Sequence, residues 1–215
     1  MNDQYLDRNK IMPTGFMTFR NREPWTTSRL IGKTNPMYVY GWFTDAEGKA
    51  FLDIVKPLKG AQIAHVGTYE GLSVSYIFPS CKKNGNTIYA IDMYYHPLLE
   101  ANLAFWGNQK DTAIMMTLSS EEAVKVFEPK SLDVVFIDGD HHFKPVCNDI
   151  WKWSRRLKEG GTLCGHDYNP IGQKEVVQAI ELLLGGEDLG HADTFWWVTV
   201  TEDLLERMKE HKNEF

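Results

Sequence analysis

The pattern of hydrophobic positions changes near residue 44. From there the stretch "TDAEGKAFLDIV" has the spacing of a helix, with Thr44 as its N-cap and with apolar positions at Ala46, Ala50, Phe51, Ile54 and Val55. The preceding residues, including "MPTGFMTFRNREPWTTSRLIGKTNP", follow neither a helical nor an alternating period. The pattern therefore predicts an irregular N-terminal arm over residues 1–43 and a folded domain over residues 44–215.

Within the domain, strand-like and helix-like stretches alternate. The expected strands are apolar on both faces, and they read "AQIAHVG", "NTIYAIDMY", "TAIMMTLS", "LDVVFIDGD" and "GGTLCGHDY". The expected helices between and after them read "LSVSYIFPSC", "HPLLEANLAFWG", "SEEAVKVF", "PVCNDIWKWSRRLK" and "QKEVVQAIELLLGG". This alternation predicts an α/β fold with a doubly wound, mostly parallel sheet, followed by one further strand in "DTFWWVTV".

Composition and charge narrow the class of protein. A chain of 215 residues with 43% hydrophobic content can bury one sizeable core. The net charge is −6 and the basic residues are scattered, which predicts no nucleic-acid partner. No apolar run approaches the roughly 20 residues of a membrane helix, so no membrane partner is expected. Three unpatterned cysteines and a polar N-terminus favour a reducing, cytoplasmic location.

Polar side chains follow the ends of the expected strands, and open parallel sheets bind ligands at the carboxyl ends of their strands. In "HVGTYEGLS", Gly67 and Gly71 enclose a strand-to-helix turn that lets a ligand approach the backbone. Asp92, at the end of the next strand, suits the two hydroxyls of a ribose, although it could instead cap the following helix. Position 69 is Tyr, so the Gly-x-Gly-x-x-Gly pattern of dinucleotide binding is missing.

On these motifs, the run from Ala61 to Val200 resembles the class I S-adenosylmethionine-dependent methyltransferases. The likeness is to the small-molecule O-methyltransferase branch, through "GTYEGLS", "FIDGDHHF" and "EGGTLCGHDY". It implies a Rossmann-like, seven-stranded sheet whose last strand, "DTFWWVTV", is antiparallel. It also implies S-adenosylmethionine as the cofactor.

The same resemblance assigns roles at the strand ends. It implies that the methionine end of the cofactor is lined by Gly67, Tyr69, Gly71 and Ser73. It implies that Asp92 binds the ribose, that Ser119 and its neighbours bind the adenine, and that Asp138 lies beneath the sulfonium. Met93 is expected to be a further cofactor-binding residue.

The chain departs from this family at His65, where an acidic residue usually contacts the amino group of the cofactor. A neutral imidazole could accept that hydrogen bond, but a protonated one would repel the sulfonium. His65 therefore leaves open a cofactor-binding scaffold without catalysis.

Methyl transfer to a hydroxyl requires a base or a metal ion to help remove the proton. Asp138 and Asp167 end strands that are adjacent in this topology, and His166 could join them as a third ligand of Mg²⁺ or Mn²⁺. His141 is the candidate general base, although Asp140 and His141 could merely tie down their loop. The remaining histidines lack a motif, and we expect them at the surface: His96, His191 and His211.

The function predicted from the sequence is S-adenosylmethionine-dependent methyl transfer to a hydroxyl of a small molecule, such as a sugar or a secondary metabolite. The arm would close over this substrate or pack in a homodimer. Two alternatives remain. One is the scaffold without catalysis, and the other is a nicotinamide-dependent oxidoreductase, which the missing third glycine disfavours.

Overall fold

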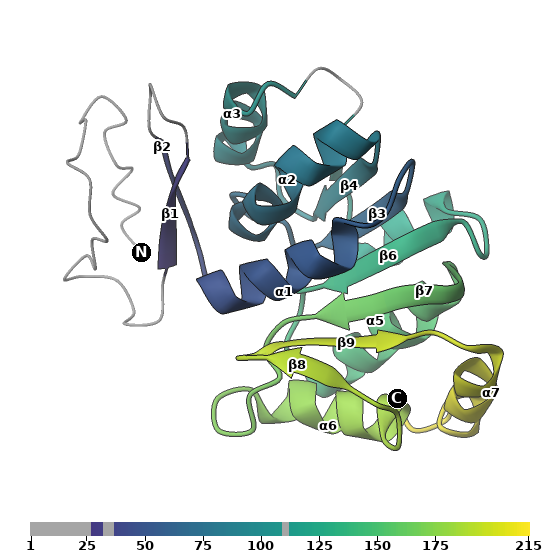
Figure 1. The fold of residues 1–215 in the computed structure, drawn as a ribbon. Coiled ribbons are helices and arrows are strands. Elements are labelled where there is room, and N and C mark those ends of the chain that lie inside the picture. Colours follow the sequence, from purple (N-terminus) through teal and green to yellow (C-terminus); the bar gives the residue numbers. More distant parts are fainter. Residues whose placement is uncertain (1–26, 32–36, 109–111) are drawn as a thin grey trace.

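The computed structural model describes residues 27–31, 37–108 and 112–215 of the chain (Figure 1). Seven strands form the central sheet in the order β5-β4-β3-β6-β7-β9-β8. Their bounds are β3 (Gln62–Val66), β4 (Thr87–Asp92), β5 (Ala113–Thr117), β6 (Leu132–Ile137), β7 (Leu157–Gly165), β8 (Gly190–Ala192) and β9 (Phe195–Thr199).

The direction of the strands confirms the predicted fold class. Neighbouring strands from β5 through β7 pair in parallel, whereas β9 is antiparallel to both β7 and β8. The sheet is thus seven-stranded and mostly parallel, and "DTFWWVTV" supplies its antiparallel last strand. Because the parallel strands all end at one edge, the loops after β3, β4, β5, β6 and β7 lie together there.

Helices cover both faces of the sheet, as Figure 1 shows. One face is packed by α1 (Asp45–Val55), α2 (Leu72–Asn84) and α3 (Pro97–Phe105). The other is packed by α4 (Ser120–Ala123), the short 3₁₀ helix η1 (Val124–Val126), α5 (Phe143–Ser154), α6 (Lys174–Leu184) and α7 (Glu202–Glu210). The core therefore consists of two apolar layers with the sheet between them.

Helix α1 begins where the sequence predicts. The Thr44 hydroxyl accepts the Glu47 amide hydrogen, and the Glu47 carboxylate accepts the Thr44 amide hydrogen in return. This capping box satisfies two backbone donors that a helix start leaves free. Phe51 and Val55, one turn apart, are fully buried against the sheet.

The arm is the part of the fold that the sequence predicted least well. Residues 1–26 and 32–36 lie outside the described residues, so most of the expected irregular arm stays a prediction. The described part instead contains an antiparallel pair of strands, β1 (Thr27–Ile31) and β2 (Met37–Gly41). Backbone hydrogen bonds hold such a pair without requiring an alternating apolar pattern, which explains why hydrophobic periodicity did not predict it.

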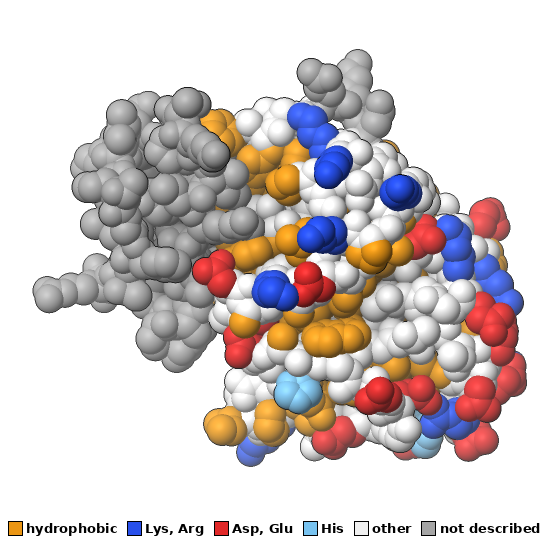
Figure 2. Space-filling view, viewed as in Figure 1, with side chains coloured by type: hydrophobic (Ala, Val, Ile, Leu, Met, Phe, Trp, Pro, Cys, Tyr) orange, Lys and Arg blue, Asp and Glu red, His pale blue; other side chains and the backbone are white. Residues whose placement is uncertain are grey.

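The described surface carries mixed charge. On the face shown in Figure 2, acidic and basic side chains are interspersed, and no continuous basic stripe is visible among the coloured residues. No helix in the described part of the chain is long and apolar enough to cross a membrane.

Candidate active site

Two loops meet where β3 and β6 end. Gly67 follows β3 with φ +79°, and a Cβ atom there would lie 1.7 Å from the Asp138 carbonyl oxygen. The Asp138 amide also donates to the Val66 carbonyl at 2.9 Å. Only glycine allows this approach, so Gly67 brings the predicted cofactor loop against the loop that carries Asp138.

Asp92 occupies the end of β4, beside the same loop. Its two carboxylate oxygens accept the amide hydrogens of Tyr69 at 2.9 Å and Tyr94 at 3.0 Å. Oδ2 keeps a second acceptor site for a ribose hydroxyl, whereas Oδ1 also faces His96 Nε2 at 3.2 Å. The N-cap of α3 is His96, not Asp92.

His96 lies beside Asp92, although its sequence context did not predict a place in the site. Its Nε2 lies 3.2 Å from Asp92 Oδ1, and its ring packs edge-on against Tyr69. Its side chain is largely buried, whereas the sequence predicted a surface residue. The only feature of the sequence that could have indicated this contact is that His96 follows Asp92 by four residues.

His65 is placed differently from the prediction. Its side chain has no exposed surface, and it stacks on Phe136 with 4.3 Å between ring centroids. Its Nε2 lies 2.7 Å from the Ser73 hydroxyl oxygen, and its Nδ1 lies 3.3 Å from that of Thr68. Both His65 and Ser73 are therefore buried and bonded to each other, and His65 shapes the loop from beneath instead of contacting a cofactor.

Burial also determines the charge of His65. It lowers the pKa of the imidazole to about 3, so the ring is neutral at physiological pH. The repulsion between an imidazolium and a sulfonium, which the sequence left open, does not arise.

The other predicted cofactor residues lie along the strand ends. Tyr69 adopts φ +49° and is 38% exposed, and Gly71, at φ +88°, is the N-cap of α2. Met93 is 60% exposed beside Asp92. The Ser119 hydroxyl accepts the Glu122 amide hydrogen as the N-cap of α4. These positions border one edge of the sheet, and their contacts with a cofactor stay predictions.

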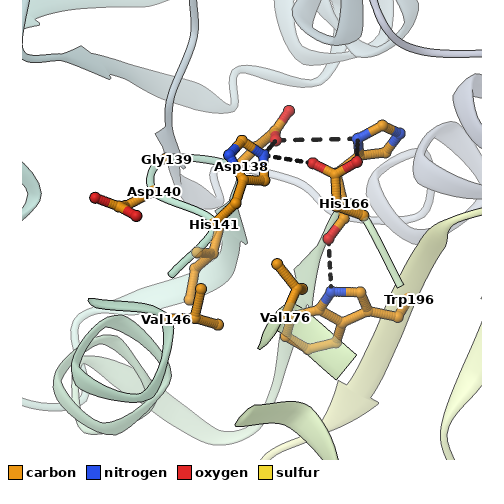
Figure 3. A pocket seen from close by; sticks show the side chains of 10 residues that line it. Asp138, Gly139, Asp140, His141, Val146, His166, Val176 and Trp196 are labelled. Carbon is orange, nitrogen blue, oxygen red and sulfur yellow. Dashed lines mark hydrogen bonds and ion pairs between the residues drawn. The ribbon is translucent and has the colours of Figure 1, made fainter. Parts of the chain in front are cut away.

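The carboxyl ends of β6 and β7 bring three potential metal or proton ligands together (Figure 3). His141 Nε2 lies 2.6 Å from Asp167 Oδ2 and 3.8 Å from Asp138 Oδ1. Among the described residues, this is the group whose ligand atoms all lie within 4.8 Å of one another. Asp167 holds its side chain there with a left-handed backbone, at φ +65°.

His166 lies beside this group but faces a second, buried set of partners. Its Nε2 lies 3.2 Å from Glu47 Oε1 and 2.9 Å from the Thr194 hydroxyl oxygen. Its Nδ1 lies 3.5 Å from Asp167 Oδ1 and 3.9 Å from Asp138 Oδ1. The structure therefore groups His141, and not the predicted His166, with the two aspartates as a ligand set.

The contact with Glu47 explains why His166 faces away from the ligand set. The Glu47 carboxylate is 1% exposed and accepts hydrogens from both the amide and the hydroxyl of Thr194. Burial alone would raise its pKa, but His166 and these hydrogen bonds lower it to about 2. Burial likewise opposes protonation of His166, yet the surrounding carboxylates raise its pKa to about 11. The two residues form a buried ion pair.

The pKa values of Asp138, Asp167 and His141 follow from the same surroundings. Burial raises the pKa of Asp138 to about 6, opposed by the charge of His166 and reinforced by that of Asp167. For Asp167, burial is outweighed by hydrogen bonds from both histidines, which hold its pKa below the usual value. The hydrogen bond with Asp167 raises the pKa of His141, against the effect of burial.

A divalent ion fits this donor set. Two carboxylates and one imidazole from adjacent strand ends suit Mn²⁺, Fe²⁺ or Zn²⁺ better than Mg²⁺, which prefers oxygen ligands alone. The imidazole and the Asp167 carboxylate are now joined by a hydrogen bond, which an ion would replace. When bound, such an ion would lower the pKa of a coordinated hydroxyl.

The neighbouring loop residues contribute less. Asp140 bonds to the amide and ring of His142 and points away from the cluster (Figure 3). Val146, Val176 and Trp196 line the pocket on its apolar side, and the Trp196 indole donates to the His166 carbonyl at 3.3 Å. The polar side chains of this pocket therefore lie on one side of it, and apolar side chains line the other.

Taken with the strand order, these strand-end loops define a class I methyltransferase fold. Residues 64–168 match the model of a family described as "Methyltransferase domain", which agrees with the predicted resemblance to class I methyltransferases.

Two relatives of the chain share part of its sequence or its fold. An uncharacterized protein of Acanthamoeba polyphaga mimivirus is 32% identical over 111 residues, covering 48% of this chain and 49% of the relative. The chain thus spans about half the length of the curated relative it matches. A structure from Corynebacterium glutamicum superposes with a TM-score of 0.60 at 15% identity, covering 74% of this chain and 82% of that one.

A second solved structure is described as an S-adenosylmethionine-dependent O-methyltransferase from Thermotoga maritima. It superposes with a TM-score of 0.54 at 13% identity, covering 80% of this chain and 77% of that one. At these identities the two structures establish the shared fold.

Proposed function

We propose that this protein transfers the methyl group of S-adenosylmethionine to a hydroxyl of a small molecule, such as a sugar or a secondary metabolite. The observation that carries the proposal is the approach of Gly67 to Asp138, which joins the cofactor loop to the cluster of Asp138, His141 and Asp167. A base and a cofactor site that share one edge of the sheet suit proton removal coupled to methyl transfer.

Asp92 and the loop from Gly67 to Gly71 would hold the cofactor, which supplies an electrophilic methyl group on a sulfonium. Asp92 Oδ2 accepts the Tyr69 amide hydrogen and keeps a second acceptor position for a ribose hydroxyl. The backbone turn at Gly67 leaves no side chain between the loop and the reacting groups.

His141 would act as the general base. In the tautomer that donates Nε2–H to Asp167, the Nδ1 lone pair can accept the proton of the acceptor hydroxyl. The hydroxyl oxygen forms the new bond to the methyl carbon, and the electron pair of the broken carbon–sulfur bond stays on sulfur. Asp167 orients the imidazole and stabilises the imidazolium that forms, as the acidic member of a histidine dyad does.

A metal ion bound by Asp138, His141 and Asp167 is the alternative way to activate the hydroxyl. In that arrangement His141 would be a ligand and could not be the base. The two versions differ in one measurable respect, because only the metal version loses activity with a chelator.

Calorimetric titration of S-adenosylhomocysteine into the full chain tests the proposal. We expect micromolar affinity, about −8 kcal/mol, with NAD as a control ligand that does not bind. Titrations with Mg²⁺, with Mn²⁺ and with chelator test the ligand set, and Asp138→Asn should abolish any metal dependence. The absence of S-adenosylhomocysteine binding in every condition would overturn the proposed function.

This titration, followed by an assay for turnover with S-adenosylmethionine, separates the competing functions. Binding of S-adenosylhomocysteine without turnover on any hydroxyl acceptor would favour a scaffold without catalysis. Binding of NAD instead would favour an oxidoreductase.

A further inference from the structure

His65 stands where the family that the chain resembles usually has an acidic residue. Its side chain has no exposed surface. It packs between two aromatic rings, with 4.3 Å to Phe136 and 6.2 Å to Phe51 between ring centroids. The imidazole is therefore enclosed beneath the loop that follows β3, and it could recognise a ligand only through one of its two ring nitrogens.

Thr68 contacts the first of these nitrogens. The Thr68 hydroxyl donates to the His65 carbonyl oxygen at 3.0 Å, with the Ile91 carbonyl oxygen at 3.2 Å. A hydroxyl has one hydrogen, so Thr68 Oγ1 can only accept from His65 Nδ1, which lies 3.3 Å away. This hydrogen-bond pattern assigns the ring hydrogen of His65 to Nδ1.

Ser73 contacts the second nitrogen. Burial lowers the pKa of His65 to about 3, so the ring is neutral and Nε2 is an acceptor when Nδ1 carries the hydrogen. The Ser73 hydroxyl, which is itself buried, lies 2.7 Å from Nε2 and donates its hydrogen there. His65 then has no lone pair left for a ligand, and it cannot replace the acidic residue as an acceptor.

The carboxylates of the neighbouring strand ends have partners of their own. Asp92 accepts two backbone amide hydrogens. Asp138 Oδ1 lies 3.8 Å from a ring nitrogen of His141 and 3.9 Å from one of His166. Among the described residues, the Ser73 side chain is hydrogen-bonded to the neutral imidazole and not to a carboxylate. This part of the loop therefore lacks the negative charge that would attract an ammonium group.

We propose that this chain binds the cofactor without recognising its amino group, and that it also accepts thioadenosines that lack this group. The inference rests on the proposed function. An ammonium group gains much from a carboxylate partner, because a hydrogen bond between charged groups is about twice as strong as one between neutral groups. Here the amino group would meet a serine and a neutral imidazole that are already bonded to each other. The adenosine part of the cofactor would supply the affinity instead.

The test compares two ligands that differ by the amino group alone. S-adenosylhomocysteine and deamino-S-adenosylhomocysteine, in which hydrogen replaces the amino group, are titrated calorimetrically into the full chain at neutral pH. A carboxylate partner would give S-adenosylhomocysteine an advantage of about ten- to hundredfold. We expect the two dissociation constants to agree within about threefold instead.

A variant that restores the acidic residue should give the converse result. His65→Glu places a carboxylate beside Ser73, and it should create a preference of about tenfold for S-adenosylhomocysteine. His191→Glu is the matched control, because it makes the same exchange at an exposed histidine of β8, and it should leave the two affinities equal. Thermal unfolding of both variants checks that they fold.

The outcomes distinguish this inference from the proposed function. If the wild type binds neither ligand, the proposed function falls and the inference falls with it. If the wild type prefers S-adenosylhomocysteine by more than about threefold, the cofactor site stands and the inference is refuted, because another group recognises the amino group. Equal affinities support the inference, and they decide alone should His65→Glu not fold. A folded His65→Glu variant without a preference would refute position 65 as the determinant.

Discussion

Replacement of Gly67 by alanine tests the loop contact on which the site depends. Gly67 has φ +79°, and the added Cβ would meet the Asp138 carbonyl oxygen at 1.7 Å and its carbon at 2.4 Å. Both atoms belong to the backbone, so no side-chain rotation can relieve the clash. The loops after β3 and β6 would have to separate.

The magnitude follows from two contributions. The left-handed backbone costs a non-glycine residue about 1–2 kcal/mol, and overpacking of a rigid site adds about 1–3 kcal/mol. We therefore expect Gly67→Ala to lower the free energy of unfolding by about 2–5 kcal/mol. Binding of S-adenosylhomocysteine should fall as well, because the displaced loop carries the predicted cofactor contacts.

Gly85→Ala separates the two contributions. Gly85 ends α2 with φ +68°, and a Cβ there would have no neighbour within 4 Å. Its substitution carries the backbone cost alone, about 1–2 kcal/mol, and should leave ligand binding unchanged. Urea unfolding followed by circular dichroism measures both variants. Equal destabilisation of the two, within about 0.5 kcal/mol, would refute the role of the Gly67 contact.

Three further predictions concern buried and catalytic side chains. Because burial lowers the pKa of His65 to about 3, its neutral form stabilises the fold above pH 6.5, the usual value, and this contribution is lost as the pH falls toward 3. His65→Gln should reduce the dependence of unfolding free energy on pH by up to about 1.4 kcal/mol per unit, as urea unfolding between pH 7.5 and 5 would reveal. Glu47→Gln removes the closest carboxylate from the buried His166 cation, which keeps Asp167 at 3.5 Å, and should cost about 3 kcal/mol or less, whereas Lys49→Gln at an exposed pair should change the melting temperature little. If His141 is the base, His141→Gln should lower kcat about 10²- to 10⁴-fold without weakening S-adenosylhomocysteine binding; an unchanged kcat would exclude that role.

Several features could be predicted from the sequence because they depend on near neighbours in the chain. The capping box at Thr44 links residues three apart, and the alternation of strands and helices is written in local periodicity. The strand ends were predicted for the same reason, since turn residues follow apolar runs. Asp138 and Asp167 could be brought together by topology alone, because their strands are adjacent in the sheet.

Side-chain partners from distant segments could not be predicted in this way. Glu47 and Thr194 are 147 residues apart, yet they share a hydrogen bond and together hold His166 away from the ligand set. Which of two nearby histidines faces Asp138 and Asp167 depends on this buried contact, and no local pattern encodes it.

The sequence by itself thus determined the order of elements, the class of fold and the edge of the sheet where chemistry gathers. The tertiary structure decided the charge of His65 and the grouping of His141 with the aspartates. The physical reason is that periodicity and turns reflect the preferences of adjacent residues. Burial and side-chain hydrogen bonding depend on which distant segments the fold packs together.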